Sequence, residues 1–189
     1  MQRTVYGLKA QLLRLAFISM LIPRLRAKKR GEDPMKGNAK VIAKLNARLA
    51  EELGAVNQYI LHSEMCANWG YGKLHEVIEK RAIDEMKHAE MLIARILFLE
   101  GKPTVSKLAE IHIGDKVETQ FKSDLAAEHG AVKAYNEDIR AADELGDGGT
   151  RDLLEKILND EEDHVDWIEA QIDQIAQMGI QSYLAEQRG

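Results

Sequence analysis

The chain has 189 residues, of which 45% are hydrophobic and 30% are charged, and its formal net charge is −5. This composition is typical of a soluble protein with one substantial core, and it is too polar for an intrinsic membrane protein. The acidic balance argues against nucleic acid as the main partner. The single cysteine, Cys66, excludes an internal disulfide and agrees with a reducing, cytoplasmic location.

Residues 1–34 differ from the rest of the chain. They carry eight basic and two acidic residues, so the remaining residues hold a net charge of −11. The apolar stretch 15–23 is too short to span a bilayer, and no small-residue cleavage site follows it. We expect 1–34 to be a basic extension that is disordered or reflects a misassigned start, with a targeting or membrane-surface helix as the alternative. A single domain is predicted over 35–189.

Within this domain, apolar side chains recur at intervals of three and four residues, which is the spacing of one helix face. The pattern predicts four long helices and a short fifth one. Their expected ranges are a helix capped by Asn38 and running to about 69, then 73–99, 116–145, a helix capped by Thr150 and ending at 178, and 180–186.

Glycine-rich turns at 70–72 and 146–149 separate the helices into two pairs, and a long linker at 103–115 joins the pairs. Short turns connect antiparallel neighbours, whereas a long linker can cross the length of a bundle. We therefore predict an all-α fold, a four-helix bundle of two antiparallel hairpins joined by a crossover.

Two motifs are repeated at one offset. The pattern E-x-G-A-V-x-x-Y occurs at 52–59 and at 128–135, and the pattern D-E-x-x-H occurs at 84–88 and at 160–164, each pair being displaced by 76 residues. Two independent motifs rarely share an offset by chance. The repeat therefore predicts an approximate internal two-fold axis.

The repeated residues suit a metal site. Helix positions i and i+3 share a face, so Glu85 with His88, and Glu161 with His164, can each point at one centre. One such pair alone is usually an ordinary surface feature, but the duplication adds Glu52 and Glu128 from the other helices. Four buried carboxylates repel one another unless cations compensate them. Two divalent ions would do so, and this oxygen-rich set favours iron or manganese over zinc or copper.

Tyrosines lie two helical turns beyond the lone glutamates, at Tyr59 and Tyr135. They could hydrogen-bond to the carboxylates or donate electrons, and an ordinary core role is an equal alternative.

Several further segments accompany these motifs, namely 35–37, 57–59, 83–88, 95–101 and 164–167. With them, the chain from Met35 onward resembles a bacterioferritin, a haem-containing member of the ferritin-like di-iron superfamily, whose donor set is the one described above. The resemblance covers nearly all of the predicted domain and leaves 1–34 outside.

The resemblance implies a homo-oligomeric cage of 24 subunits built from two-fold dimers, which stores iron as a ferric mineral. It implies a ferroxidase that oxidises Fe²⁺ with O₂ or H₂O₂ at two iron ions per subunit, and a ferredoxin-type reductant for iron release. The catalytic residues and metal ligands carried over are Glu52, Glu85, His88, Glu128, Glu161 and His164.

The same resemblance makes Met86 an axial ligand of a haem b shared between two subunits, with Leu53, Val56 and Ile60 as an apolar lining. Two positions depart from the family pattern, and the first puts the family's inner-surface iron site in doubt here. Lys80 occupies the position of a histidine that pairs with Asp84 in the family's inner-surface iron site, and Leu92 stands where some members carry tyrosine. Trp167 remains as a redox-active candidate.

Two other functions stay open from the sequence. One is a di-metal peroxidase or catalase-like bundle without storage, and the other is a haem-binding helical module or scaffold. The mass of the assembly would distinguish the di-metal peroxidase from a storage cage. The metal content would distinguish the haem-binding module or scaffold from a di-iron protein.

Overall fold

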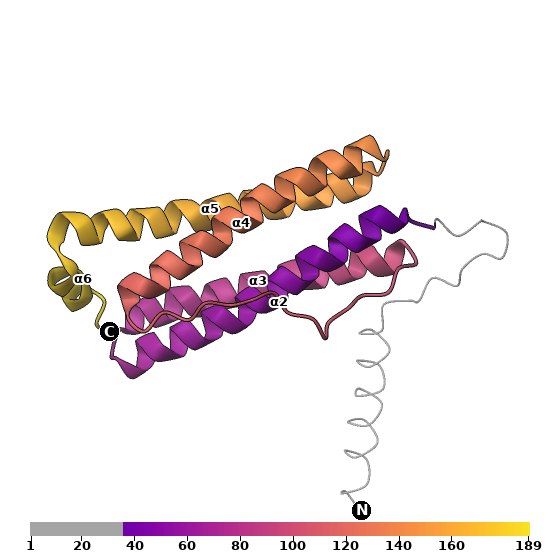
Figure 1. Cartoon of the computed structure of the whole chain (residues 1–189). Helices are drawn as coiled ribbons and strands as arrows, with labels where there is room; N and C mark the ends of the chain where they lie inside the picture. The colour runs from indigo at the N-terminus through magenta and orange to yellow at the C-terminus, as the bar shows by residue number, and fades with distance from the viewer. Residues whose placement is uncertain (1–35) are drawn as a thin grey trace, which may run out of the picture. The chain divides into compact units, whose positions relative to one another are not determined.

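The structure, a computed structural model, describes residues 36–189, and the predictions for 1–34 lie outside these residues. The described part contains five helices and no strand (Figure 1). They are α2 (Ala39–Asn68), α3 (Gly72–Phe98), α4 (Val117–Glu144), α5 (Gly148–Met178) and α6 (Ile180–Glu186). The predicted all-α bundle with a short final helix is confirmed.

The helices form two antiparallel hairpins, α2 with α3 and α4 with α5 (Figure 1). Helix α4 packs beside α2, and α5 lies against α3, so the hairpins enclose a common centre. None of the described helices is both long and apolar enough to cross a membrane.

The crossover between α3 and α4 runs along α2 and is tied to it at several points. The backbone N–H of Ala109 donates to the carbonyl of Ala50 at 2.9 Å. The N–H of His112 donates to Gln58 Oε1 at 2.8 Å, and the N–H of Gly114 donates to His62 Nε2 at 3.0 Å. The linker is therefore ordered by α2 and forms one wall of the central region.

Local capping chemistry sets the start of α2 and both ends of α5. The Asn38 side chain accepts from the N–H of Lys40 at 2.8 Å, as its predicted cap role requires. Gly179, with φ 78°, ends α5 in a conformation that favours glycine. The predicted Thr150 cap is wrong, because Asp147 caps α5 by accepting from the Thr150 N–H at 3.0 Å. A carboxylate accepts better there, and the Thr150 hydroxyl also donates to it at 2.7 Å.

The apolar core is divided into two clusters. One lies where α2 begins and α3 ends, around Leu49, Leu92 and Ile157. The other lies where α2 ends, around Ile78, Phe121 and Tyr183, and includes residues of α6. Their burial supplies the main stabilisation of the bundle. The bundle can hold a polar layer between these clusters because both ends are firmly packed.

Candidate metal centre

The structure brings all six predicted ligand residues to one point at mid-length of the bundle. Helix α2 supplies Glu52, α3 supplies the Glu85–His88 pair, α4 supplies Glu128 and α5 supplies the Glu161–His164 pair. Their exposed fractions range only from 1% to 8%. Charged side chains are rarely buried so deeply without a compensating partner.

Each histidine directs Nδ1 at three carboxylates. His88 Nδ1 lies 3.0 Å from Glu85 Oε2, 3.2 Å from Glu161 Oε1 and 3.6 Å from Glu52 Oε2. His164 Nδ1 lies 3.0 Å from Glu85 Oε1, 3.3 Å from Glu161 Oε2 and 3.5 Å from Glu128 Oε1. The internal repeat of the sequence therefore appears as a repeat in the geometry.

The donors fall into two overlapping groups whose ligand atoms lie within 4.8 Å of one another. Glu85 and Glu161 belong to both groups, whereas Glu52 and His88 complete one and Glu128 and His164 complete the other. This is the arrangement needed for two metal ions that share two central carboxylates and each take one further carboxylate and one imidazole.

Without a metal, the centre balances its charges with protons. Burial opposes ionisation of Glu85, but its hydrogen bonds to His164 and His88 outweigh that effect and lower the pKa to about 2. The pKa of Glu161 is also lowered, since the same histidines outweigh burial and the charge of Glu85. Burial would lower the pKa of His164, but hydrogen bonds to Glu128 and Glu161 raise it to about 11. The two central carboxylates are therefore ionised beside charged imidazole.

The outer carboxyl groups behave in the opposite way. Burial raises the pKa of Glu128 to about 8, and it raises the pKa of Glu52 well above its ordinary value. The pKa of His88 is raised by Glu161, Glu52 and Glu85 against the effect of burial. At neutral pH, two ionised carboxylates thus face two imidazolium groups, and the raised pKa values of the outer carboxyls favour their protonated forms. Divalent cations can replace these protons.

The buried polar atoms of the centre fit metal ions. Glu85 Oε1, Glu161 Oε1 and His164 Nδ1 are buried, and their close contacts within the centre do not have the geometry of full hydrogen bonds. Most buried polar atoms in proteins have a hydrogen-bond partner. Oxygen and imidazole donors that converge in this way are suited to iron or manganese.

The two tyrosines link the hairpins. Tyr59 on α2 donates its hydroxyl proton to Glu128 on α4, and Tyr135 on α4 donates to Glu52 on α2. Each outer glutamate is therefore oriented by the tyrosine of the opposite hairpin. Of the roles considered for the two tyrosines, the structure therefore contains the hydrogen bonds to the carboxyl groups.

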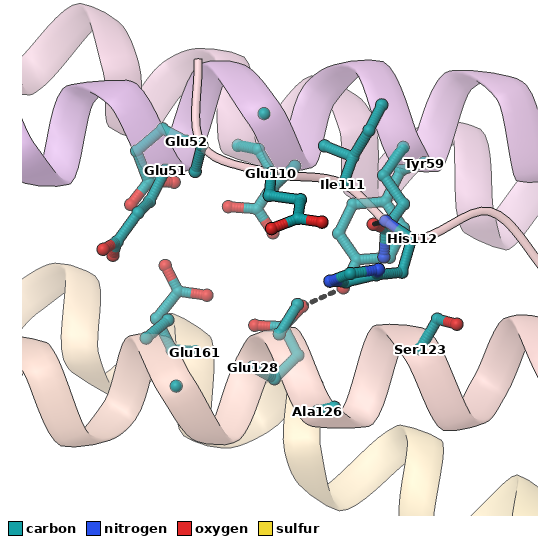
Figure 2. A pocket seen from close by; sticks show the side chains of 18 of the residues that line it. Glu51, Glu52, Tyr59, Glu110, Ile111, His112, Ser123, Ala126, Glu128 and Glu161 are labelled. Atoms are coloured by element: carbon teal, nitrogen blue, oxygen red, sulfur yellow. Dashed lines mark hydrogen bonds between the residues drawn. The ribbon is translucent and has the colours of Figure 1, made fainter. Parts of the chain in front are cut away.

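A cavity of about 570 Å³ opens beside the centre between α2, α4 and the crossover. Figure 2 shows the carboxyl groups of Glu51, Glu52, Glu128 and Glu161 directed into it from facing helices. Glu110 and His112 of the crossover also line it. The cavity therefore provides an acidic approach to the centre from this face of the bundle.

Met86 lies outside the centre and is 47% exposed on α3. Of the apolar residues expected around it, Ile60 is also exposed, Val56 is half-buried, and Leu53 packs against the core. Leu92 is buried in the first core cluster, and Trp167 forms an edge contact with Phe121.

Some contributors were not anticipated from the sequence. Asp160 Oδ2 lies 3.1 Å from His88 Nε2 and can orient that ring. Its repeat partner Asp84 accepts from Lys87 instead, at 2.7 Å. The repetition of the Asp in D-E-x-x-H could have indicated the contact of Asp160 with His88. No local signal indicated that Arg48 and Arg81 would be buried beside Tyr135 and Tyr59.

The fold and the site together define a ferritin-like protein, and residues 42–178 match the ferritin-like domain family. The chain is similar to a bacterioferritin of Brucella melitensis, with 42% identity over 149 residues, 79% of this chain and 92% of that protein. A bacterioferritin of Rhodobacter capsulatus shows the same identity and coverage. One of Mycobacterium leprae is 39% identical over 152 residues, 80% of this chain and 96% of that protein. The chain belongs to the bacterioferritin family.

Proposed function

We propose that this chain is the subunit of an iron-storage ferroxidase, which oxidises Fe²⁺ with O₂ or H₂O₂ and deposits the ferric product as a mineral inside a 24-subunit cage. Membership of the bacterioferritin family supports iron storage in general. The observation that carries the ferroxidase proposal is the buried set of four glutamates and two histidines in two overlapping groups.

In this proposal, Fe²⁺ is the substrate and the six residues are its ligands. Glu85 and Glu161 are shared by both ions, Glu52 and His88 serve one ion, and Glu128 and His164 serve the other. Four ionised carboxylates balance two Fe²⁺ ions. Oxidation to Fe³⁺ adds two positive charges that this ligand set does not balance, which favours hydrolysis and departure of the product.

The neighbouring residues prepare the site for this exchange. Tyr59 and Tyr135 hold the outer glutamates in place, so little reorganisation is needed when the ions arrive. The acidic cavity lined by Glu51 and Glu110 is the proposed approach for Fe²⁺, because negative potential raises the local concentration of cations.

Haem b is proposed as a second cofactor, bound between two subunits by Met86 of each. The exposed side chain of Met86 fits this role, because it lies on α3 away from the buried metal ligands and is accessible to a group between two subunits. Axial thioether ligands favour the reduced state of haem iron. The proposed role of the group is to accept electrons from an external donor and pass them on for iron release. The proposed electron donor is a small ferredoxin-type protein, and the proposed location is the cytoplasm.

The ferroxidase proposal is tested with Glu52→Gln, Glu128→Gln. Glutamine keeps an oxygen that can accept from each tyrosine but removes the negative charge that a metal needs. We expect the initial rate of Fe²⁺ oxidation, measured by the absorbance of the ferric product, to fall to the rate without protein. The matched control is Glu64→Gln, Glu137→Gln, which removes two exposed glutamates from the same helices. A double Glu52, Glu128 variant that oxidises Fe²⁺ at the native rate would exclude the assignment.

Storage is tested by sedimentation of the purified protein. A 24-subunit cage of this chain has a mass on the order of half a megadalton. A dimer with two metal ions per chain would instead support the di-metal peroxidase, and protein that purifies without metal and does not bind Fe²⁺ would support a haem-binding scaffold.

A further inference from the structure

A second cavity, of about 600 Å³, lies on the opposite face of the metal centre. It is lined only by residues of α3 and α5, whereas the first cavity lies between α2, α4 and the crossover. His88 and His164 are part of its lining. The two cavities therefore approach the same centre from two sides, and they differ in charge.

The second cavity has an excess of unpaired cations. Its basic residues are Lys80, Arg81, Lys87 and Lys156, and its acidic residues are Asp84, Asp160 and Asp163. Lys87 pairs with Asp84 at 2.7 Å, and Asp160 lies against His88 at 3.1 Å. Among the described residues, this leaves Lys80 and Lys156 without a carboxylate partner, Arg81 with one long contact to Glu128, and the carboxylate of Asp163 free.

Arg81 is the most unusual member of this lining. Its exposed fraction is 7%, and its guanidinium makes no hydrogen bond within residues 36–189. The nearest carboxyl oxygen, Glu128 Oε1, lies 3.9 Å from Nη1. That carboxyl group already accepts from Tyr59 and is directed at the metal centre rather than at Arg81.

The position of Arg81 is nevertheless fixed. Its guanidinium carbon lies 5.1 Å from the centre of the Trp167 ring and 5.9 Å from that of Tyr59. Stacking on aromatic rings holds a guanidinium without using its N–H groups. A planar set of free N–H donors at the edge of a cavity is suited to a bidentate oxyanion such as phosphate.

A metal ion suits this cavity less well. The metal-compatible donor groups found in the described part of the chain are the two groups of the central site, and none includes Asp84, Asp160 or Asp163. The ammonium group of Lys80 also repels cations from this face.

From these contacts, we propose that the cavity between α3 and α5 binds inorganic phosphate, held by Arg81 and by the ammonium groups of Lys80 and Lys156. The bound anion would lie beside the two histidines of the metal centre. Its use as a partner for ferric ions leaving that centre rests on the proposed function, but the binding of phosphate itself does not.

The experiment is a calorimetric titration of metal-free, full-length protein with inorganic phosphate at constant ionic strength. We expect one phosphate per chain. The exposed pair Lys80→Gln, Lys156→Gln should weaken binding about tenfold or more, since it removes two charge-assisted contacts without disturbing the core. Arg81→Gln should weaken phosphate binding to a similar extent. The phosphate affinity of Arg81→Lys should lie between those of Arg81→Gln and the native protein, because lysine keeps the charge but lacks the planar donors.

Lys133→Gln is the matched control, because Lys133 is an exposed lysine on α4 outside the cavity. Absence of binding at millimolar phosphate, or equal affinity in the native protein and the Lys80, Lys156 double variant, would overturn the proposal. Tighter binding of AMP than of free phosphate would overturn the assignment to inorganic phosphate.

The Glu52, Glu128 double glutamine variant separates this proposal from the ferroxidase. It should still bind phosphate, because neither residue lines the second cavity. Loss of phosphate binding in that variant would contradict the independence of the two sites.

Discussion

The hairpin α2/α3 and the hairpin α4/α5 are nearly equivalent around the metal centre but differ at their outer surfaces. Each supplies a lone glutamate, a Glu-x-x-His pair and a tyrosine that reaches across to the other hairpin. Outside the centre, Met86 of the first hairpin corresponds to Glu162 of the second. Two similar ions need similar ligands, so the repeat is kept where the metals bind, and each outer surface is free to serve another purpose.

The largest expected difference between the hairpins concerns haem. Met86→Leu keeps an apolar side chain of similar volume but removes the sulfur ligand, so we expect complete loss of haem binding. The measurement is the absorption spectrum after reconstitution with haem b. Met178→Leu, at an exposed methionine of the second hairpin, should leave the spectrum unchanged. Retention of a native haem spectrum in Met86→Leu would show that the two surfaces do not differ in this way.

The protons of the centre should make metal binding strongly dependent on pH in both hairpins. In the half formed by Glu128 and His164, the raised pKa values of about 8 and about 11 mean that both groups hold a proton below pH 8. A metal ion must displace both, so its affinity should rise about 100-fold per pH unit below pH 8. Above pH 8 only the imidazole proton remains, and the rise should be about tenfold per unit.

This dependence is measured with Co²⁺, which avoids oxidation, by titrations at several pH values in buffers of different ionisation enthalpy. Equal proton release for the first and second ion would support equivalent hairpins. An affinity for Co²⁺ that is the same at about pH 6 and about pH 7.5 would contradict the protonation described for Glu128 and His164.

The tyrosines should have a smaller effect, equal in the two hairpins. Tyr59→Phe and Tyr135→Phe each remove one hydrogen bond to an outer glutamate. We expect each change to lower Co²⁺ affinity about 10- to 100-fold, the range for residues that orient metal ligands. A much larger effect of one change than of the other would show that the two hairpins do not orient their outer glutamates equally. The buried Tyr183, which lies outside the centre, provides the control Tyr183→Phe.

The sequence predicted most of the fold because helical periodicity and several of the signals that bound these helices are local. Asn38 begins α2 and Gly179 ends α5 through their own side chain and backbone, so these two bounds depend little on tertiary contacts. The repeat also identified the residues that meet at the centre, since a shared offset reports symmetry directly. Asp147 was missed as a cap because it lies only three residues from Thr150, and both residue types are common at helix starts.

Contacts between the hairpins could not be predicted in the same way. The pairing of Tyr59 with Glu128, and of Tyr135 with Glu52, depends on how α2 packs against α4. The burial of Arg81 depends likewise on Trp167, which lies on α5. Such contacts join residues far apart in the sequence, and helical periodicity gives no information about them.

The smallest expected difference concerns the turns that close the hairpins. Tyr71, which precedes α3, makes no side-chain capping bond, whereas Asp147 caps α5 and also pairs with Arg95 at 2.5 Å. Asp147→Ala should lower the free energy of unfolding by about 1 kcal/mol, measured by chemical denaturation. Asp147→Asn keeps a capping oxygen and should lose less.

The effect of Asp147 should also depend on pH. Burial would raise the pKa of this carboxyl, but hydrogen bonds to Thr150 and Arg95 outweigh burial and lower it below its ordinary value of 3.8. A lowered pKa in the folded state means that the ionised group stabilises the fold at neutral pH and that this contribution is lost on acidification. The difference between native protein and Asp147→Ala should therefore narrow as the pH falls below 4, an approximate limit set by that ordinary value. A constant difference would assign the stabilisation to the shape of the turn rather than to the charge of Asp147, and would remove this distinction between the two hairpins.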